Sequence, residues 1–253
     1  MSYFYYQQEG GEESWKPIPF KLRPQHEAAN KARYYTALSV SGLLESAEPD
    51  ERDKMKYSGP LYFDWDGEDN AFVTEQAIKL LTRIEEMGVN MASIALYATG
   101  GRGYHCEIPQ EIFMEKPGEM MYLPSIYREI ALELAVDTLD LRVYSGKRGR
   151  MWRTPNVLRE NGRFKVPITW EELKVMTPEI YLDICKQTRP IIPLVKQGQC
   201  LELTIEFDKA VQKVKGRTAK RKAKSSPDLQ KLRQSSMPSL IALVEGRGLR
   251  RGV

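Results

Sequence analysis

Two aspartates on either side of a tryptophan are the first residues in this chain whose types and spacing suggest chemistry. Asp64 and Asp66 follow the apolar run Leu61-Tyr62-Phe63 and precede the turn-like segment Gly67-Glu68-Asp69-Asn70. Alternate residues of an extended strand point to opposite faces, so both carboxylates would lie on one face. Neighbouring carboxylates repel each other unless a cation neutralises them, and Mg²⁺ and Mn²⁺ prefer such oxygen ligands. The alternative is a strand that ends in a solvated acidic turn.

A glycine-rich turn and a histidine form the second candidate element. The segment Thr99-Gly100-Gly101-Arg102-Gly103 joins two expected strands, at residues 92–98 and 104–109, and His105 follows it. Glycines let backbone N–H groups approach phosphate oxygens, and Arg102 and His105 can neutralise phosphate charge. The alternatives are ordinary hairpin chemistry for the glycines and a core position for the histidine.

A third carboxylate follows later in the chain. Asp140 lies on an expected strand at residues 139–144, and Asp137 competes with it for the same role. Three carboxylates can hold two divalent ions, which activate a 3′-hydroxyl and stabilise a leaving pyrophosphate. Arg148 and Arg153 come next, and arginine suits bidentate phosphate contacts, although both could belong to a solvated face.

Strands and helices of ordinary length would position these residues. Residues 1–24 are aromatic and polar with two glycines and two prolines, and we expect an irregular arm there. Apolar spacing over residues 74–87 indicates an amphipathic helix with Thr74 as its N-cap. Further helices are expected from residue 25, over residues 124–139, and from residues 169 and 177; further strands are expected at residues 34–40, 61–66 and 163–168.

Whole-chain composition excludes several classes of protein. The 253 residues are 42% hydrophobic and 28% charged, as in soluble domains with a packed core. No apolar run reaches the length of a membrane span, and the N-terminus lacks the features of a signal peptide. The three cysteines are far apart, which fits a reducing compartment and predicts neither a zinc knuckle nor a disulfide framework. We expect a cytoplasmic protein.

The basic residues concentrate near the C-terminus. Residues 209–236 are expected to form a flexible basic linker after a core at residues 1–208, and residues 237–253 resemble the opening of another helix. The chain ends too soon to bury that helix, so we expect either a fragment or a helix that docks back. Attraction of nucleic acid is a secondary role for the cations of the linker, which are Lys213, Lys215, Arg217, Lys220, Arg221 and Lys222.

The order of these motifs resembles the archaeo-eukaryotic primase superfamily, particularly the primase-polymerases of phages and plasmids. The resemblance spans residues 60–170 and rests on Tyr62-Phe63-Asp64-Trp65-Asp66, on the turn that leads to His105, and on Asp140-Leu141-Arg142-Val143-Tyr144 followed by arginines. The spacing of Val143-Tyr144 favours Asp140 over Asp137. Gly103 departs from the family, which often has serine two positions before the histidine.

The resemblance implies an α+β, two-lobed catalytic core with an RNA-recognition-like sheet lobe and a smaller N-terminal α/β lobe. It implies a template-directed nucleotidyltransferase, a DNA primase or DNA polymerase, that uses two Mg²⁺ or Mn²⁺ ions in a bacterial or phage-infected cell. Its partners would be single-stranded DNA template and primer, nucleoside triphosphates, and a replicative helicase in trans or on a C-terminal part that is absent. Asp64, Asp66 and Asp140 would hold the metals; candidate nucleotide contacts are Thr99, Arg102, Gly103, His105, Arg148, Arg153 and Lys165.

Two other classes of function use the same residues. A metal-dependent nuclease or another phosphotransferase would need the same carboxylates. A replication protein without catalytic activity would bind single strands through the basic segment. Lys165 could equally be an exposed strand residue.

Overall fold

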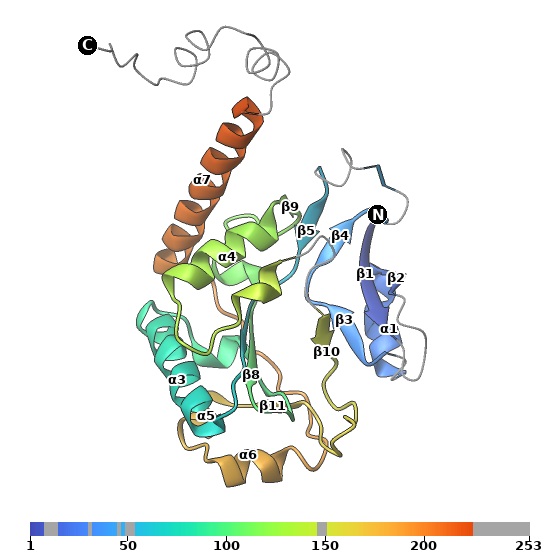
Figure 1. Ribbon diagram of the computed structural model, residues 1–253, viewed down its shortest axis with the longest axis vertical. Helices are drawn as coiled ribbons and strands as arrows, with labels where there is room; N and C mark the ends of the chain where they lie inside the picture. Colours follow the sequence, from blue (N-terminus) through green and yellow to red (C-terminus); the bar gives the residue numbers. More distant parts are fainter. Residues whose placement is uncertain (8–14, 30–31, 45–46, 49–53, 146–150, 225–253) are drawn as a thin grey trace, which may run out of the picture. The chain divides into compact units, whose positions relative to one another are not determined.

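The computed structural model describes residues 1–7, 15–29, 32–44, 47–48, 54–145 and 151–224, and its fold is α+β (Figure 1). The chain divides into two units, Met1–Ala210 and Val211–Val253, which are considered separately below. The first unit contains two antiparallel sheets and the predicted site residues from Asp64 to Lys165. Among the helices of the described residues, none combines the length and the apolar character that crossing a membrane requires.

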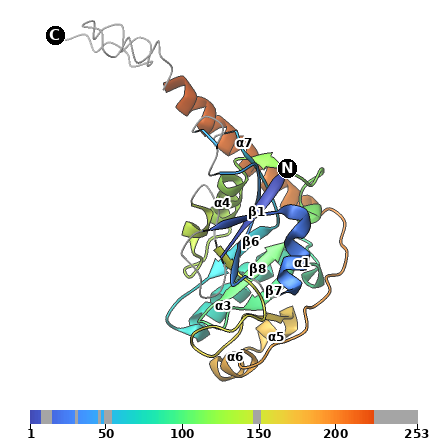
Figure 2. The ribbon, with the colours of Figure 1, turned by 90° about the vertical axis from the view of Figure 1, so that its right-hand side faces the viewer.

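A four-stranded sheet carries most of the predicted site. Its strand order is β11-β7-β8-β6, and every neighbouring pair is antiparallel. The chain order β6, α3, β7, β8, α4, β11 makes two interleaved split βαβ units, because β8 lies between β6 and β7, and β7 lies between β8 and β11. Figure 2 shows β6, β8 and β7 side by side. The bounds are Leu61–Trp65 for β6, Ala95–Ala98 for β7, Tyr104–Ile108 for β8 and Val166–Ile168 for β11.

Helix α3, Asn70–Glu86, packs against one face of this sheet and is the helix that the apolar spacing predicts. Its Thr74 hydroxyl lies 2.7 Å from the Tyr104 hydroxyl of β8. The predicted N-cap is wrong: the side chain of Asp69 accepts hydrogen bonds from the backbone N–H groups of Ala71 and Phe72. A carboxylate before the first turn satisfies unpaired N–H groups there, and Thr74 instead bonds within the helix to the Asn70 carbonyl.

The second sheet begins with the first residues of the chain, so the expectation of an irregular arm is wrong. β1, Ser2–Gln7, pairs with β2, Lys16–Pro19, and also with β3 and β4. Its sequence, SYFYYQ, is rich in aromatic residues that favour strands. Tyr5 is fully buried, and its hydroxyl accepts a hydrogen bond from the Leu44 N–H. Prolines and glycines near β1 concealed this strand, because its partners lie far away in the chain.

The strand order of this sheet is β10-β3-β1-β4-β5-β9, with β2 on β1. It therefore joins the N-terminal strands to strands from the middle of the chain. In particular, β10 contains the predicted Arg153 and pairs with β3, with Trp152 opposite Tyr35. The bounds are Tyr34–Thr36 for β3, Ser39–Ser41 for β4, Lys56–Ser58 for β5, Met120–Met121 for β9 and Met151–Arg153 for β10.

The remaining helices connect the strands of the first unit. α5 begins with the predicted capping box, in which Thr169 accepts from the Glu172 N–H and Glu172 accepts from the Thr169 N–H. The bounds are Arg23–Ala28 for α1, Leu123–Glu133 for α4, Trp170–Lys174 for α5 and Pro178–Ile184 for α6. Short 3-10 helices occupy Phe20–Leu22, Met91–Ser93, Gln110–Ile112 and Leu141–Tyr144.

The basic segment forms a helix where a flexible linker was expected. α7 extends over Leu201–Lys224, so the prediction is wrong for residues 209–224. Leu203, Phe207, Ala210 and Val214 recur at helical spacing through the start of the basic run, and this period was missed because the charges dominate the composition. The rest of the expected linker and the expected helix at residues 237–253 lie outside the described residues.

Candidate functional site

Backbone pairing joins the two segments that carry the three predicted carboxylates. Leu139 forms an isolated antiparallel bridge with Trp65, the residue between Asp64 and Asp66. The Asp140 N–H donates to the Asp64 carbonyl at 2.8 Å, and the Asp66 N–H donates to the Thr138 carbonyl at 3.1 Å. The carboxylates of Asp64, Asp66 and Asp140 therefore arise from two adjoining segments at one edge of the four-stranded sheet.

Only one bridge is present where a strand was expected at residues 139–144. The chain turns immediately into the 3-10 helix Leu141–Tyr144, so this prediction is wrong. The reason is local: the Asp140 side chain caps that helix by accepting the Arg142 N–H at 2.9 Å. Aspartate satisfies an unpaired N–H at a helix start, which ends the strand pairing at Leu139.

His105 lies beside the edge of the sheet that carries Asp64, Asp66 and Asp140, which is called the acidic edge below. Asp64 of β6 lies directly opposite His105 of β8, which in turn lies opposite Tyr97 of β7. Side chains opposite each other share a face, so these three belong to the face away from Phe63 and Tyr104. The Nε2 atom of His105 lies 3.4 Å from Oδ1 of Asp64, and both side chains are buried. The predicted association of His105 with Asp64 is thus present in the structure.

In this structure an arginine, Arg142, forms an ion pair with one carboxylate of the acidic edge. The Arg142 Nε atom donates to Oδ1 of Asp140 at 2.9 Å, and the hydrogen bond and charge of Asp140 raise the pKa of Arg142, with smaller contributions from Asp66 and Asp64. Asp66 is exposed, and its Oδ1 accepts the Gly67 N–H. Across the part of the chain that is described, no three His, Cys, Asp or Glu side chains are grouped so that they could hold a metal ion.

The donor types nevertheless suit a hard divalent cation. Carboxylate oxygens are the ligands that Mg²⁺ and Mn²⁺ prefer, and a cation already lies against this cluster in the form of the Arg142 guanidinium. Arg142 is exposed, with 87% of its side-chain surface accessible, so its displacement from Asp140 requires no repacking of the core. Asp64, Asp66 and Asp140 thus supply the donor types that such a cation prefers, although their side chains are not grouped as a metal site among the described residues.

Trp152 covers His105 from the other sheet. The indole of β10 stacks on the imidazole at 3.8 Å between ring centroids and an interplanar angle of 23°. Burial lowers the pKa of His105 and the charge of Lys165 lowers it further, whereas Asp64 opposes both. The Nδ1 atom of His105 is buried and has no hydrogen-bond partner among the described residues. The lowered pKa favours the neutral form of the imidazole, whose Nδ1 atom is the one without a partner among the described residues.

Lys165 is a fully buried cation beside the histidine, so the alternative of an exposed strand residue is wrong. Its Nζ atom lies 3.9 Å from Oε1 of Glu107 and 4.2 Å from the centre of the Tyr97 ring. It makes no hydrogen bond within the described residues. Burial lowers the pKa of Lys165 to about 8, although Glu107 and Asp64 favour the charged form.

Lys165 opens onto a cavity of about 460 Å³ that both sheets line. Two other donors in its wall, Nη1 of Arg153 and Oγ1 of Thr154, are also buried and without partners among the described residues. Burying three unsatisfied donors is unfavourable unless a ligand or water accepts their hydrogen bonds. The lining residues are Arg23, Glu27, Tyr35, Tyr97, Glu107, Trp152, Arg153, Thr154, Pro155, Asn156, Lys165 and Ile191.

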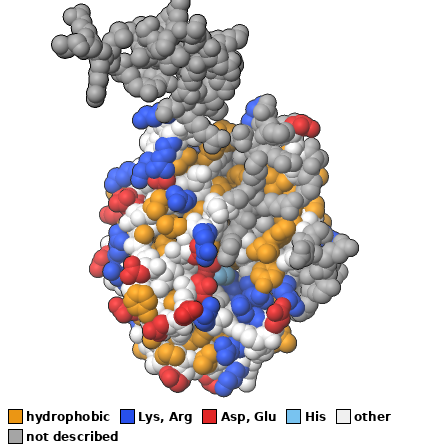
Figure 3. Space-filling view, viewed as in Figure 1, with side chains coloured by type: hydrophobic (Ala, Val, Ile, Leu, Met, Phe, Trp, Pro, Cys, Tyr) orange, Lys and Arg blue, Asp and Glu red, His pale blue; other side chains and the backbone are white. Residues whose placement is uncertain are grey.

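Arg153 lies in a strongly cationic environment. Its guanidinium packs over the ring of Tyr34 at 4.5 Å and donates to the Tyr34 hydroxyl. Burial lowers the pKa of Arg153, and the neighbouring charges of Arg159 and Arg33 lower it further. Figure 3 shows Lys and Arg side chains gathered next to Asp and Glu side chains around a histidine on this face. The other predicted arginine, Arg148, lies outside the described residues.

The glycines of the turn have a packing role that the phosphate hypothesis did not anticipate. A Cβ atom on Gly103 would lie 1.8 Å from the carbonyl oxygen of Trp65, and one on Gly100 would lie 2.3 Å from that of Phe164. Gly100 also has a φ of +69°, which disfavours other residues. These positions therefore require glycine because neighbouring backbone segments approach closely.

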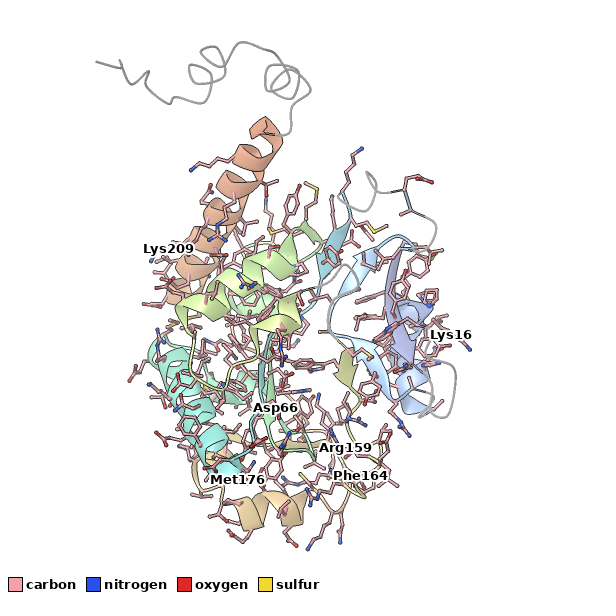
Figure 4. The ribbon with its side chains drawn as sticks, in the orientation of Figure 1. Lys16, Asp66, Arg159, Phe164, Met176 and Lys209 are labelled. Carbon is pink, nitrogen blue, oxygen red and sulfur yellow. The ribbon has the colours of Figure 1, made fainter. Side chains whose placement is uncertain are left out.

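The other turn residues point into different environments. The Thr99 hydroxyl lies 3.3 Å from the Tyr181 hydroxyl and accepts the Gly101 N–H, while the Arg159 guanidinium donates to the Thr99 carbonyl. Arg102 is exposed. In Figure 4, Asp66, Arg159 and Phe164 lie at the same end of the four-stranded sheet. Thr99 and Arg102 therefore contact other residues than the His105 and Lys165 group.

Sequence reasoning missed Trp152, Glu107 and Arg159. Trp152 lies between the predicted residues Arg148 and Arg153, and this stretch was interpreted for its charge alone. Glu107 has a signal that could have been used, because it follows His105 by two residues on a strand and so shares its face. Arg159 contacts the turn only through a chain reversal, in which Leu158 pairs with Phe164, and no local pattern indicates this.

The predicted nucleic-acid contacts lie on α7. Lys213, Lys215, Arg217 and Lys220 are exposed, whereas the side chains of Arg221 and Lys222 lie outside the described part of the structure. Lys213 and Arg217 each make interactions with other groups. The helix thus carries a concentration of positive charge, as the sequence predicts.

No family model matches the chain, and no curated protein sequence matches it.

Proposed function

We propose that this protein is a template-directed nucleotidyltransferase, a DNA primase or DNA polymerase that adds nucleotides to a 3′-hydroxyl with the aid of two Mg²⁺ or Mn²⁺ ions. One observation carries the proposal: backbone hydrogen bonds join the Asp64-Trp65-Asp66 segment to Asp140, and His105 lies against Asp64. Carboxylates from separate segments that meet beside an imidazole suit the binding of a metal–triphosphate complex. The primase-polymerase core with an RNA-recognition-like lobe is the finer fold that accompanies this proposal.

The cavity beside the carboxylates supports a triphosphate substrate. Lys165, Arg153 and Thr154 all line this cavity and each has a buried donor without a partner among the described residues, and the cations of Arg33 and Arg159 lie near Arg153. A phosphate oxygen would accept hydrogen bonds from such donors, and the bonds to charged groups are the stronger ones. Binding an anion there would offset the unfavourable burial of the lysine.

Different residues of the site would have different roles in the proposed reaction. Asp64, Asp66 and Asp140 would hold the metal ions, which supply neutralisation of the triphosphate and a more acidic 3′-hydroxyl. For this, Arg142 must leave Asp140. His105 and Lys165 would orient the triphosphate while the closely packed indole of Trp152 excludes water from the imidazole. Positioning and charge stabilisation account for most of the acceleration in phosphoryl transfer.

Primer extension tests the proposal directly. Purified protein is incubated with Mg²⁺ or Mn²⁺ and either ribo- or deoxyribonucleoside triphosphates, on primed and unprimed single-stranded templates. We expect incorporation by the wild type and loss of it in the double variant Asp64→Ala, Asp66→Ala and in Asp140→Asn. Asp137→Asn is the matched control, because this exposed aspartate lies three residues from Asp140 and should be dispensable. No incorporation with either metal, or full activity without the carboxylates, would reject the proposal.

Two further outcomes would indicate other functions. Shortening of labelled DNA in the absence of nucleotides, with dependence on the same carboxylates, would identify a nuclease. Binding of single-stranded DNA that weakens steeply with salt and survives loss of all three carboxylates would identify a binding protein that acts through α7.

A further inference from the structure

A single side chain, Trp152, contacts three polar groups beside the acidic edge: those of His105, Glu107 and Lys165. Its ring stacks on His105, and its Nε1–H donates to the carboxylate of Glu107. The Nζ atom of Lys165 lies 5.1 Å from the centre of the same indole and 3.9 Å from Glu107. Tyr62 closes the group with an edge contact to the indole at 5.3 Å. Trp152 is only 4% exposed and therefore has little freedom to move.

Trp152 and His105 belong to different sheets, so their stacking contact joins the two sheets. Trp152 belongs to β10, which pairs with β3 of the N-terminal sheet, whereas His105 and Glu107 belong to β8 of the other sheet. The Nε2 atom of His105 lies 3.4 Å from Asp64, and its other ring nitrogen is unpaired among the described residues. The contact with Asp64 holds one edge of the buried imidazole. The stacked indole of Trp152 holds one face of the same ring.

We propose that Trp152 is a positioning residue, through which the N-terminal sheet holds the His105 imidazole and the Glu107–Lys165 pair in the orientation that the reaction requires. The inference rests on the proposed function for its catalytic consequence, but the stacking itself is independent of any activity. Trp152 contacts no reacting atom in this account. It acts by fixing groups that do.

The stack is tested by nuclear magnetic resonance of the histidine rings. The chain has only two histidines, so His105→Gln assigns the signals of His105 and leaves those of His26. An indole face shifts the ring protons stacked on it to lower frequency through its ring current. At a fixed pH of 8, we expect shifted His105 signals in the wild type, a smaller shift in Trp152→Phe and no shift in Trp152→Leu. Unshifted signals in the wild type would overturn the proposal.

The catalytic consequence is tested by steady-state nucleotide incorporation with the same variants. We expect kcat to fall about tenfold to a hundredfold in Trp152→Leu, with a smaller change in KM, because misplacing a catalytic group by about 1 Å has effects of that order. Trp152→Phe keeps an aromatic face and should recover most of the activity. Circular dichroism and thermal unfolding show that each variant is folded.

Trp170 provides a matched control. It is also a buried tryptophan, it donates its Nε1–H to a glutamate, Glu85, and Lys174 lies 5.4 Å from its ring centre. It lies on α5 and contacts neither His105 nor Lys165 through any interaction described here. Trp170→Leu should lower stability as much as Trp152→Leu does while leaving kcat unchanged. Equal losses of kcat in the two variants would overturn the proposal.

The two proposals fail separately. If the wild type incorporates no nucleotide but the ring-current shift follows Trp152 as expected, the proposed function fails and the positioning of His105 stands. If incorporation requires the carboxylates but Trp152→Leu keeps the wild-type kcat, the nucleotidyltransferase stands and the role of Trp152 is refuted.

Discussion

Replacing Lys165 by methionine should stabilise the protein at neutral pH and abolish the phosphate binding that we propose for the cavity. The side chain is fully buried. Its Nζ atom lies 3.9 Å from Oε1 of Glu107, which is longer than a hydrogen bond. Methionine keeps an unbranched apolar chain of similar length and removes the charge. A buried cation that lowers stability is typical of a functional site.

The magnitude follows from the pKa of Lys165. Burial lowers it from 10.5 to about 8, and each pH unit of difference corresponds to about 1.4 kcal/mol, so the charged form costs roughly 3 kcal/mol of folding stability. The methionine variant also loses the cation–π contact of Nζ with the Tyr97 ring at 4.2 Å. This loss reduces the expected gain in stability by about 1 kcal/mol. We expect Lys165→Met to be more stable than the wild type by about 2 kcal/mol at pH 7.

The sign of the pH dependence is specific. Below pH 8 the lysine is protonated in both the folded and the unfolded state, so the wild type bears the full penalty. Between about pH 8 and 10.5 only the unfolded state binds the proton, so wild-type stability rises with pH relative to the variant. The stability gap should therefore close over this range.

Urea unfolding of both proteins from pH 7 to pH 10.5 measures the gap, and other titrating groups cancel in the difference. Lys186→Met is the control, because that lysine is 67% exposed and should change stability by less than about 0.5 kcal/mol. Pyrophosphate at about a hundred times its Kd should stabilise the wild type by roughly 2.7 kcal/mol and leave Lys165→Met unchanged. A variant that is less stable at pH 7, with a gap independent of pH, would refute the reasoning about the cavity.

Arg142→Ala should lower the Mg²⁺ concentration needed for half-maximal activity, because Asp140 no longer bonds to a guanidinium; an unchanged metal titration would contradict this. Gly103→Ala should cost about 3 kcal/mol or prevent folding, since its Cβ would lie 1.8 Å from a backbone oxygen, whereas Gly198→Ala, with open space around it, should be near neutral in the same urea titration. Asp69→Ala should lower stability by about 1 kcal/mol through loss of two N-cap hydrogen bonds, and thermal unfolding that matches the wild type would refute the assignment of the cap.

Local patterns were enough to predict the central part of the fold. The strand at Asp64, the hairpin before His105 and the helix after Asn70 all have apolar periods that short windows of sequence contain. The order of the motifs predicted that Asp64, His105 and Asp140 lie close together, and the structure has a side-chain contact between His105 and Asp64 and a backbone hydrogen bond between Asp140 and Asp64. The α+β class, by contrast, was implied by the family resemblance, and the structure has this class.

Elements whose partners are distant in the chain could not be predicted in this way. β1 is a strand because β2, β3 and β4 pair with it, and its own flanking residues indicate a loop. Asp140 begins a 3-10 helix instead of continuing a strand, because its side chain caps the N–H two residues later, a choice that nearby strand formers do not reveal. α7 was concealed by its charges.

The residue types and their spacing were enough to select the candidate groups: three carboxylates, a histidine, a lysine and several arginines. Only the folded arrangement reveals that Lys165 is buried without a hydrogen bond to any described residue and that Trp152, from the other sheet, covers His105. The physical reason is that residue type and local period set which groups can ionise or coordinate, whereas burial, and with it pKa and orientation, depends on segments that meet only when the chain folds.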